Sequence, residues 1–535
     1  MKQVRLFIKP FSLTAVDARC SSQLLADKTI FSLWFFVTKE KTNRHLLCIA
    51  LVATILQFML FKWLYPYPDF VPDSYTYIYA ATAHLDISIQ PIAYSKFLAI
   101  FHSLTHSDVV VIAFQYFLLE GAALFLFFSI LIFHTLSRAT RTILFIFLFL
   151  NPLFLYIGNY IDNISLFIAL SILWFTQMLW LIRRPSWGKI FILAVLVFFC
   201  VAIKNNAYYY LTITAIGILL TPSKPLFKLA GILAPFLLIL PFMMRNREEA
   251  RKITNTAQPS LNRGWELANN SLYMRSHILI DSMALPTAEI RQLDGMVREF
   301  YKHIWIENLN DYLAQSSGIF FIEDSRAPLK QFLNKHFYTT DRNQSIAAWG
   351  KASAVFKGYG CWLIRHYPLS FVHYFILPNI RNYFIPPLGS MESYNQGADE
   401  TALVVQDWFD YTTPAIPAVS KTLQGNILLP FPYLFLLMQI LYVGGIILWS
   451  IEKRFKFSDP AISRSILLGA LFWALNFFHS LFVGPIVLRD QLSSMILTGV
   501  YVLLLIELID NKETIFNSLV LTSPEVHIPS KNEMQ

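Results

Sequence analysis

Long apolar segments alternate with shorter polar segments along most of the chain. A membrane-spanning helix needs about 20 mostly apolar residues, and seven segments of roughly that length stand out. They are residues 46–65, 109–134, 143–160, 163–182, 428–450, 465–484 and 491–509. Three shorter apolar segments follow the same alternation, at residues 189–203, 207–221 and 228–243. The pattern predicts an all-α polytopic membrane protein with about ten transmembrane helices.

The composition favours the same class. The 535 residues are 55% hydrophobic and only 14% charged, whereas soluble domains carry roughly 25% charged residues. The net charge of +9 would suit a nucleic-acid-binding protein, but the basic residues are scattered among the hydrophobic segments. We therefore interpret them as determinants of membrane topology and expect no nucleic-acid partner.

The cysteines and the N-terminal segment carry little functional signal. Cys20, Cys48, Cys200 and Cys361 have no CxxC spacing, which predicts neither a zinc site nor a disulfide framework. No short apolar stretch near the N-terminus ends in a small-residue cleavage site, so no cleaved signal peptide is expected. Residues 28–38 are interpreted as a segment on the membrane surface at most.

Basic residues near the ends of the spans orient them, since cytoplasmic connections are enriched in Lys and Arg. The basic tail of residues 1–45 is therefore expected in the cytoplasm. Each connection predicted inside carries a basic cluster, while the short outside connections carry at most one cation each. The inside clusters are Arg138/Arg141, Arg183/Arg184, Lys224/Lys228 and Lys453/Arg454/Lys456. An even number of spans returns residues 510–535 to the cytoplasm, and a bacterial inner membrane is the expected location.

Two outside regions interrupt the membrane portion, which comprises residues 46–244 and 428–509. The first external loop, residues 66–108, predicts two juxtamembrane helices. Residues 245–427 form a larger, more polar and mostly helical external region, in which apolar residues recur at helical spacing within 287–316. The segment 366–387 is apolar but is interrupted by prolines, which predicts an interfacial or re-entrant helix rather than a span.

Three stretches carry a family resemblance. They are "PDSYTYIYAA" at 72–81, "LNPLFLYIGNYIDNISLFIAL" at 150–170 and "VGPIVLRDQLSSMIL" at 483–497. With a carboxylate just outside the first span, they resemble the GT-C superfamily of integral membrane glycosyltransferases, which take a sugar from a polyprenyl-phosphate carrier. The branch of protein mannosyltransferases, aminoarabinose transferases and lipopolysaccharide-core galacturonosyl transferases looks nearest. The resemblance covers most of the membrane portion and leaves residues 245–427 unmatched.

The resemblance implies catalytic roles for two carboxylates. Asp73 would face the reaction centre and deprotonate or orient the acceptor hydroxyl, which attacks poorly unless a base takes its proton. Many family members carry a second acid directly after this position, where this chain has Ser74. Asp162, in an outside turn, would be the second catalytic acid. The alternatives are that Asp73 is a plain helix N-cap and that Asp162 caps the helix after it. No D-x-D motif is present, so no cofactor is predicted, with a divalent metal left open.

Further side chains are expected to bind the substrates. Cations near the outer surface would bind the donor phosphate, or would alternatively only reach toward lipid headgroups. They are Lys96, Lys204, Arg245 and Arg489. The alternative for Arg489 is that it only neutralises the adjacent Asp490, which replaces the aromatic residue of the family motif. Candidate contacts to sugar or acceptor are Asp69, Tyr77, Trp265, Glu266 and Asn269. The alternatives are a solvated turn for Asp69 and a packed core position for Trp265.

The expected function is transfer of a sugar from a polyprenyl-phosphate donor to a lipid, glycan or protein acceptor on the external, periplasmic face. Direct displacement would invert the anomeric carbon. The alternatives are a polysaccharide polymerase or ligase, and a flippase or transporter of lipid-linked glycans. A transporter needs polar residues near the middle of the membrane, where Glu120 is the main example. Most other polar residues gather at one face, which favours a one-sided reaction.

Overall fold

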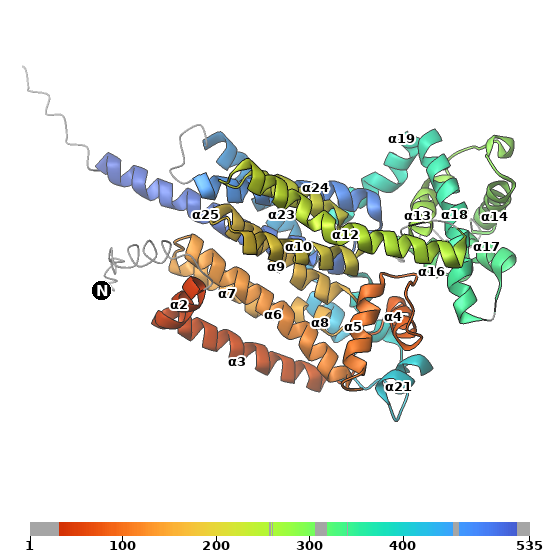
Figure 1. Cartoon of the computed structure of the whole chain (residues 1–535), viewed down its shortest axis with the longest axis horizontal. Helices are drawn as coiled ribbons and strands as arrows, with labels where there is room; N and C mark the ends of the chain where they lie inside the picture. Colours follow the sequence, from red (N-terminus) through yellow and green to blue (C-terminus); the bar gives the residue numbers. More distant parts are fainter. Residues whose placement is uncertain are drawn as a thin grey trace, which may run out of the picture.

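A computed structural model describes residues 31–255, 258, 260–304, 318–339, 341–452 and 460–521. Within these residues the chain is helical, and the only β-pairing consists of two isolated bridges. The long helices run side by side along the long axis of the molecule, and shorter helices gather at one end (Figure 1). Residues 1–30 of the predicted tail lie outside the described residues, and Phe31–Lys39 forms helix α2.

Eight helices of the described residues are long and apolar enough to cross a membrane. They are Lys41–Leu64 (α3), Asp108–Phe133 (α6), Arg138–Gly158 (α7 and α8), Ile164–Arg183 (α9), Pro225–Thr254 (α12), Leu423–Ile451 (α22 and most of α23), Pro460–Val483 (α24) and Leu488–Ile509, the first part of α25. The chain is therefore a multi-pass helical membrane protein.

The two other predicted spans are shorter helices. Trp187–Ile203 (α10) has 17 apolar residues, and Tyr209–Leu219 (α11) has 11 after a short 3-10 turn. A straight helix rises 1.5 Å per residue, so 11 residues cover about 17 Å, roughly half of the hydrocarbon core. The prediction of membrane helices is thus confirmed for eight, and the count of ten stays a prediction.

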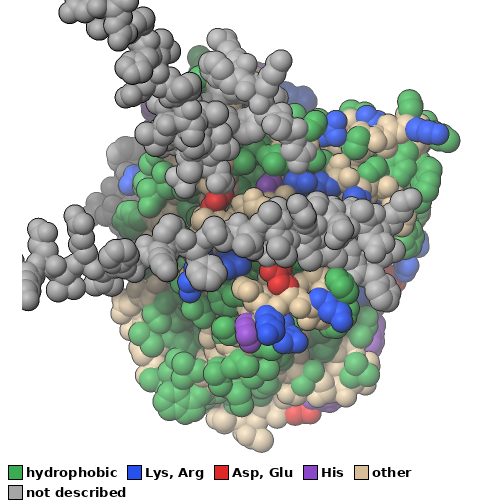
Figure 2. Space-filling view, turned by 90° about the vertical axis from the view of Figure 1, so that its left-hand side faces the viewer, with side chains coloured by type: hydrophobic (Ala, Val, Ile, Leu, Met, Phe, Trp, Pro, Cys, Tyr) green, Lys and Arg blue, Asp and Glu red, His purple; other side chains and the backbone are tan. Residues whose placement is uncertain are grey.

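Burial separates central from peripheral helices. In α9, 89% of the membrane-length window is buried inside the protein, against 17% in α3. Large apolar side chains of α3 such as Leu56, Met59 and Trp63 are exposed, as expected of a surface that faces lipid tails. Viewed from the end of the bundle where α2 begins, hydrophobic side chains dominate the flanks and Lys and Arg side chains lie between them (Figure 2).

The first external loop forms the two predicted short helices, Pro72–Thr82 (α4) and Ile92–His102 (α5). A second hydrophobic core joins mainly residues between Ala250 and Tyr383, together with Ile87, Leu481 and Ile486. Its helices are Arg263–Arg275 (α13), Ala288–Ile304 (α14), Phe320–Glu323 (α16), Pro328–Phe337 (α17) and Arg342–His366 (α18). In contrast, buried residues between Leu388 and Ile416 pack in a different hydrophobic core, which the long helices form.

Helices α13 and α18 cross closely because glycines remove side chains at the crossing. A Cβ atom at Gly264 would lie 1.8 Å from the carbonyl oxygen of Ser353, and one at Gly360 would lie 2.7 Å from the backbone of Leu267. Neither position has room for a larger residue. The backbone N–H of Gly264 instead donates a hydrogen bond to Ser353 Oγ. This close crossing fixes the position of α13 relative to α18.

Two further predictions concern this region. The amphipathic pattern of 287–316 matches α14, in which Ile290, Leu293 and Val297 are buried, while its continuation to Leu313 lies outside the described residues. The segment 366–387 contains Pro368–Phe371 (α19), a π-helical turn and Leu377–Phe384 (α20). It is not among the helices long and apolar enough to span a membrane.

Candidate active site

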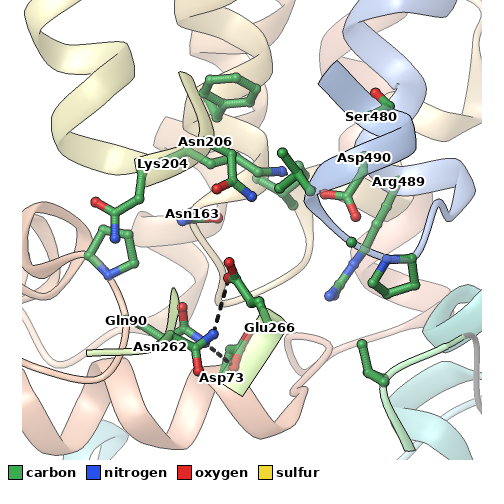
Figure 3. Close-up of a pocket in the computed structure, with 18 of the residues that line it drawn as sticks. Asp73, Gln90, Asn163, Lys204, Asn206, Asn262, Glu266, Ser480, Arg489 and Asp490 are labelled. Carbon is green, nitrogen blue, oxygen red and sulfur yellow. Dashed lines mark hydrogen bonds and ion pairs between the residues drawn. The ribbon is translucent and has the colours of Figure 1, made fainter. Parts of the chain in front are cut away.

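A cavity of about 280 Å³ lies between the long helices and the short helices at one end of them. Its wall comes from five parts of the chain: the first external loop, the turn before α9, the turn after α10, helices α13 and α16, and the junction of α24 with α25. Its charged lining residues are Asp73, Asp162, Lys204, Glu266, Glu323, Arg489 and Asp490. Figure 3 shows most of these side chains directed into one space.

Asp73 lies in the first turn of α4, but it is not the N-cap. The N-cap position is Val71, whose backbone N–H donates to Ser74 Oγ. The N-cap alternative for Asp73 is therefore wrong. Its carboxylate instead accepts a 2.7 Å hydrogen bond from the amide of Gln90, which lies just before α5. Burial, and after it the charge of Asp162, raise the pKa of Asp73 to about 7.

Asp162 lies in the tight turn before α9, and its side chain is almost completely buried. One of its oxygens accepts a hydrogen bond from the backbone N–H of Asn163, and the other lies 3.4 Å from the guanidinium of Arg489. This ion pair joins the turn before α9 to the first turn of α25. It also neutralises Asp162, which makes burial of the carboxylate less costly.

A second ion pair lies beside the first. Lys204, at the C-terminus of α10, contacts the carboxylate of Asp490 at 2.6 Å. Its ammonium also lies 5.1 Å from the ring centre of Phe167. The neighbours Arg489 and Asp490 therefore reach different partners, and the direct neutralisation considered for this pair is not the observed contact. Both cations are about one-fifth exposed and line the cavity.

Helix α13 carries Glu266 and Asn269 into the cavity wall. Glu266 accepts a hydrogen bond from the amide of Asn262 at 3.3 Å, and burial raises its pKa to about 7 against the opposing charge of Arg263. The amide of Asn269 is completely buried and donates to the backbone oxygen of Gly318 at 2.8 Å. Figure 3 shows Glu266 between Asp73 and Asn163.

Tyr77 also lines the cavity. It follows Asp73 by one helical turn on α4, and its ring packs edge-on against Tyr94 of α5. Only 1% of its surface is accessible, so the Tyr77 side chain is packed between the two juxtamembrane helices.

Four other candidates lie outside the cavity. Lys96 and Arg245 both pair with Asp86, at 3.8 and 3.1 Å, and their side chains are 48% and 69% exposed. Trp265 is completely buried and stacks on Trp349 with ring centres 3.8 Å apart. This is the core position considered as its alternative, although Trp265 is the neighbour of Glu266 in sequence.

Asp69 is the fourth, and it is buried rather than solvated. Its carboxylate accepts a hydrogen bond from the backbone N–H of Asn395 at 3.0 Å and one from the amide of Gln424 at 3.4 Å. Burial raises its pKa to about 7, while these hydrogen bonds oppose the shift. Asp69 therefore fastens the first external loop to the segment that precedes α22, and it does not line the cavity.

Sequence reasoning missed several lining residues. Glu323 lies on α16, which has only four residues and no periodicity to detect. Gln90 and Asn262 are single amides within loops, and their hydrogen bonds to Asp73 and Glu266 depend on tertiary contacts. Asn163 carries a detectable signal, because it directly follows Asp162 and shares its turn.

The two cations of the cavity and two of its carboxylates come from different parts of the chain. The cations Lys204 and Arg489 come from the ends of apolar helices, while Glu266 and Glu323 come from the short helices beyond them. No group of three His, Cys, Asp or Glu side chains in the described part of the chain is arranged to hold a metal ion. The arrangement offers fixed cations for an anionic group, and carboxylates with a raised pKa for proton transfer.

No family model, no curated protein and no solved structure matches this chain. The chemistry that the cavity can perform is therefore argued from its residues and from their position at the end of the apolar helices.

Proposed function

We propose that the protein is a membrane glycosyltransferase that moves a sugar from a polyprenyl-phosphate donor to a hydroxyl-bearing acceptor. The observation that carries the proposal is the convergence of Asp73 with two cations in one cavity, at the end of the apolar helices. A carrier lipid has an apolar chain that suits the bilayer and an anionic head that suits these cations. A reaction between such a lipid and a polar acceptor needs both environments at one place.

In the proposed reaction, the acceptor hydroxyl oxygen attacks the anomeric carbon. The new carbon–oxygen bond forms as the bond from that carbon to the phosphate oxygen breaks. The electron pair of the broken bond stays on the phosphate, and the hydroxyl proton passes to the carboxylate of Asp73. Because the attack is direct, the configuration at the anomeric carbon inverts.

Lys204 and Arg489 would stabilise the phosphate as its negative charge grows. Each of them already has an acidic partner, so an incoming phosphate would share these cations with Asp490 and Asp162. Arginine suits a phosphate through two parallel N–H donors, whereas lysine acts as a point charge. Lys96 and Arg245 are less suited, because their ion pair with Asp86 lies away from the cavity.

The proposal includes a membrane orientation. Ten crossings result if α10 and α11 also traverse the bilayer, with both termini in the cytoplasm and the cavity at the external face of a bacterial inner membrane. The basic pairs at 138/141 and 183/184 lie at the ends of α7 and α9 that are remote from the cavity, which agrees with the preference of Lys and Arg for the cytoplasmic side.

The test is sugar transfer by the purified protein, in nanodiscs, from a panel of radiolabelled polyprenyl-phosphate sugars to a mixed acceptor extract. Asp73→Asn removes the base with little change of shape, and we expect transfer to fall about 10²–10⁴-fold. The exposed Asp407→Asn on α21 (Leu403–Phe409) is the matched control and should keep the wild-type rate. Equal transfer by wild type and Asp73→Asn would remove Asp73 from the mechanism, and no transfer from any donor by wild type would contradict the proposal.

A further inference from the structure

The carboxylates of the cavity outnumber its cations. Asp162 pairs with Arg489 and Asp490 pairs with Lys204. The three remaining carboxylates, Asp73, Glu266 and Glu323, have no cation within 4.0 Å among the described residues. Asp73 and Glu266 accept hydrogen bonds from neutral amides only. The cavity therefore has an acidic part that its own side chains do not neutralise.

An independent observation in the same wall points to a missing donor. Asn269 is completely buried, and its Oδ1 atom has no hydrogen-bond partner in the described part of the chain. Its Nδ2 atom is already used by Gly318 and Asn270. The atom left over is an acceptor, and the carboxylates that line the same cavity are acceptors as well. A buried acceptor without a donor costs free energy, so this wall is suited to a group that only donates.

We infer that the wall formed by Glu266, Glu323 and Asn269 binds an ammonium group on the acceptor, so that the acceptor is an amine-bearing molecule such as an amino sugar. The inference rests on the proposed function and names its substrate class. An ammonium has a positive charge and three donors but no acceptor, and it matches both the charge and the unpaired oxygen. An acceptor with a phosphate near its hydroxyl would be repelled by the same carboxylates.

The placement of the charges assigns the ammonium to the acceptor rather than to the donor lipid. Glu266 and Glu323 are on α13 and α16, which belong to the second core beyond the long helices. Lys204 and Arg489 are at the ends of apolar helices, where a lipid phosphate arrives. Asp73 lines the same cavity as both groups. The base is thus reached by an acceptor that enters along the acidic wall.

Binding of two matched probes tests the inference without any donor lipid. 2-Aminoethyl glucoside carries a primary amine that stays protonated at pH 8, as a lysine amine does, and its N-acetyl derivative has the same ring without the charge. Isothermal titration calorimetry of the full-length protein in nanodiscs gives both dissociation constants. For the wild type we expect about tenfold tighter binding of the amine, in line with close charge pairs at interfaces.

Glu266→Gln/Glu323→Gln keeps the shape and removes both charges, and we expect the preference for the amine to disappear. Glu248→Gln, an exposed position on α12 with no ion pair within 4.0 Å in the described chain, is the matched control and should keep it. Equal affinity of the wild type for the two probes would overturn the inference, as would an unchanged preference in the double variant. If the wild type prefers the amine but transfers no sugar, only the proposed function is contradicted. If it transfers sugar in a way that depends on Asp73 but does not prefer the amine, only this inference is contradicted.

Discussion

Asp73 is surrounded by groups that shift its protonation in opposite directions. Burial, Asp162 and Glu323 raise its pKa, while Arg489 and the hydrogen bond from Gln90 lower it, and the result is about 7. A carboxylate acts as a base only when ionised. The reactive fraction of Asp73 should therefore increase as the pH rises through 7 and decrease below it.

We predict that the initial rate of sugar transfer rises about tenfold between pH 6 and pH 8, the change in ionised fraction for a pKa of about 7. Asp162→Asn removes a neighbouring negative charge and frees Arg489 to act on Asp73, so the midpoint of the profile should move to lower pH. The measurement is the rate with saturating donor across pH 5.5–8.5. A wild-type midpoint near 4, or an upward shift in Asp162→Asn, would contradict the role of Asp73.

At the scale of residues, the local sequence does not show that Asp69 and Asp73 have different surroundings. The two aspartates lie four positions apart, each beside a proline, and local pattern barely separates them. What distinguishes them is a hydrogen bond from Asn395, 326 residues away. In contrast, Asp73, Asp162, Lys204 and Arg489 share one cavity as expected, because each follows or precedes an apolar segment at the same end of the helices.

At the scale of elements, the crossing of α13 and α18 positions Glu266 and Asn269. Gly264→Ala would place a methyl group 1.8 Å from the carbonyl oxygen of Ser353, and the helices would have to separate. We predict a loss of about 1–3 kcal/mol in the free energy of unfolding, as in other overpacked sites, together with weaker binding of the aminoethyl probe. Differential scanning fluorimetry gives the melting temperature.

Gly295→Ala is the control for this substitution, since a Cβ atom at Gly295 in α14 meets nothing within 4 Å. Alanine is a better helix former than glycine by about 1 kcal/mol, so this variant should be as stable as the wild type or slightly more stable. A Gly264→Ala protein that melts with the wild type would show that the two helices do not cross so closely.

The long apolar helices were predictable from the sequence, as were α4, α5 and α14, whereas other helices of the polar region were not. The segment predicted at 109–134 is observed as Asp108–Phe133 (α6), because a run of that length has few alternatives to a helix in lipid. Helix α13 was missed, since its apolar face packs against the distant α18 and its sequence "RGWELANNSLYMR" has weak periodicity. The position of α13 depends on its tertiary contact with α18, which the local sequence pattern does not indicate.

At the scale of the whole molecule, the proposed orientation puts the two ends of the bundle in different compartments. In a chain whose cysteines are replaced by serine, we predict that Ser103→Cys in the first external loop reacts with a membrane-impermeant maleimide in intact spheroplasts. Ser186→Cys, in the connection between α9 and α10, should react only after the membrane is permeabilised. Both serines are exposed in the structure. Labelling of both positions in intact spheroplasts would contradict the orientation.

The hydrogen bond from Asn395 to Asp69 has a consequence for biogenesis. Asn395 also bonds Phe70 and Pro68 through its side chain, across a separation of more than 320 residues. During synthesis the first loop therefore leaves the ribosome long before the residue that fastens it exists. Arg489 is made later still, so a nascent chain holds Asp162 without the cation that pairs with it. A chain that stops short of its last helix would therefore lack the part of the cavity wall that Arg489, Asp490, Gln491 and Ser493 form.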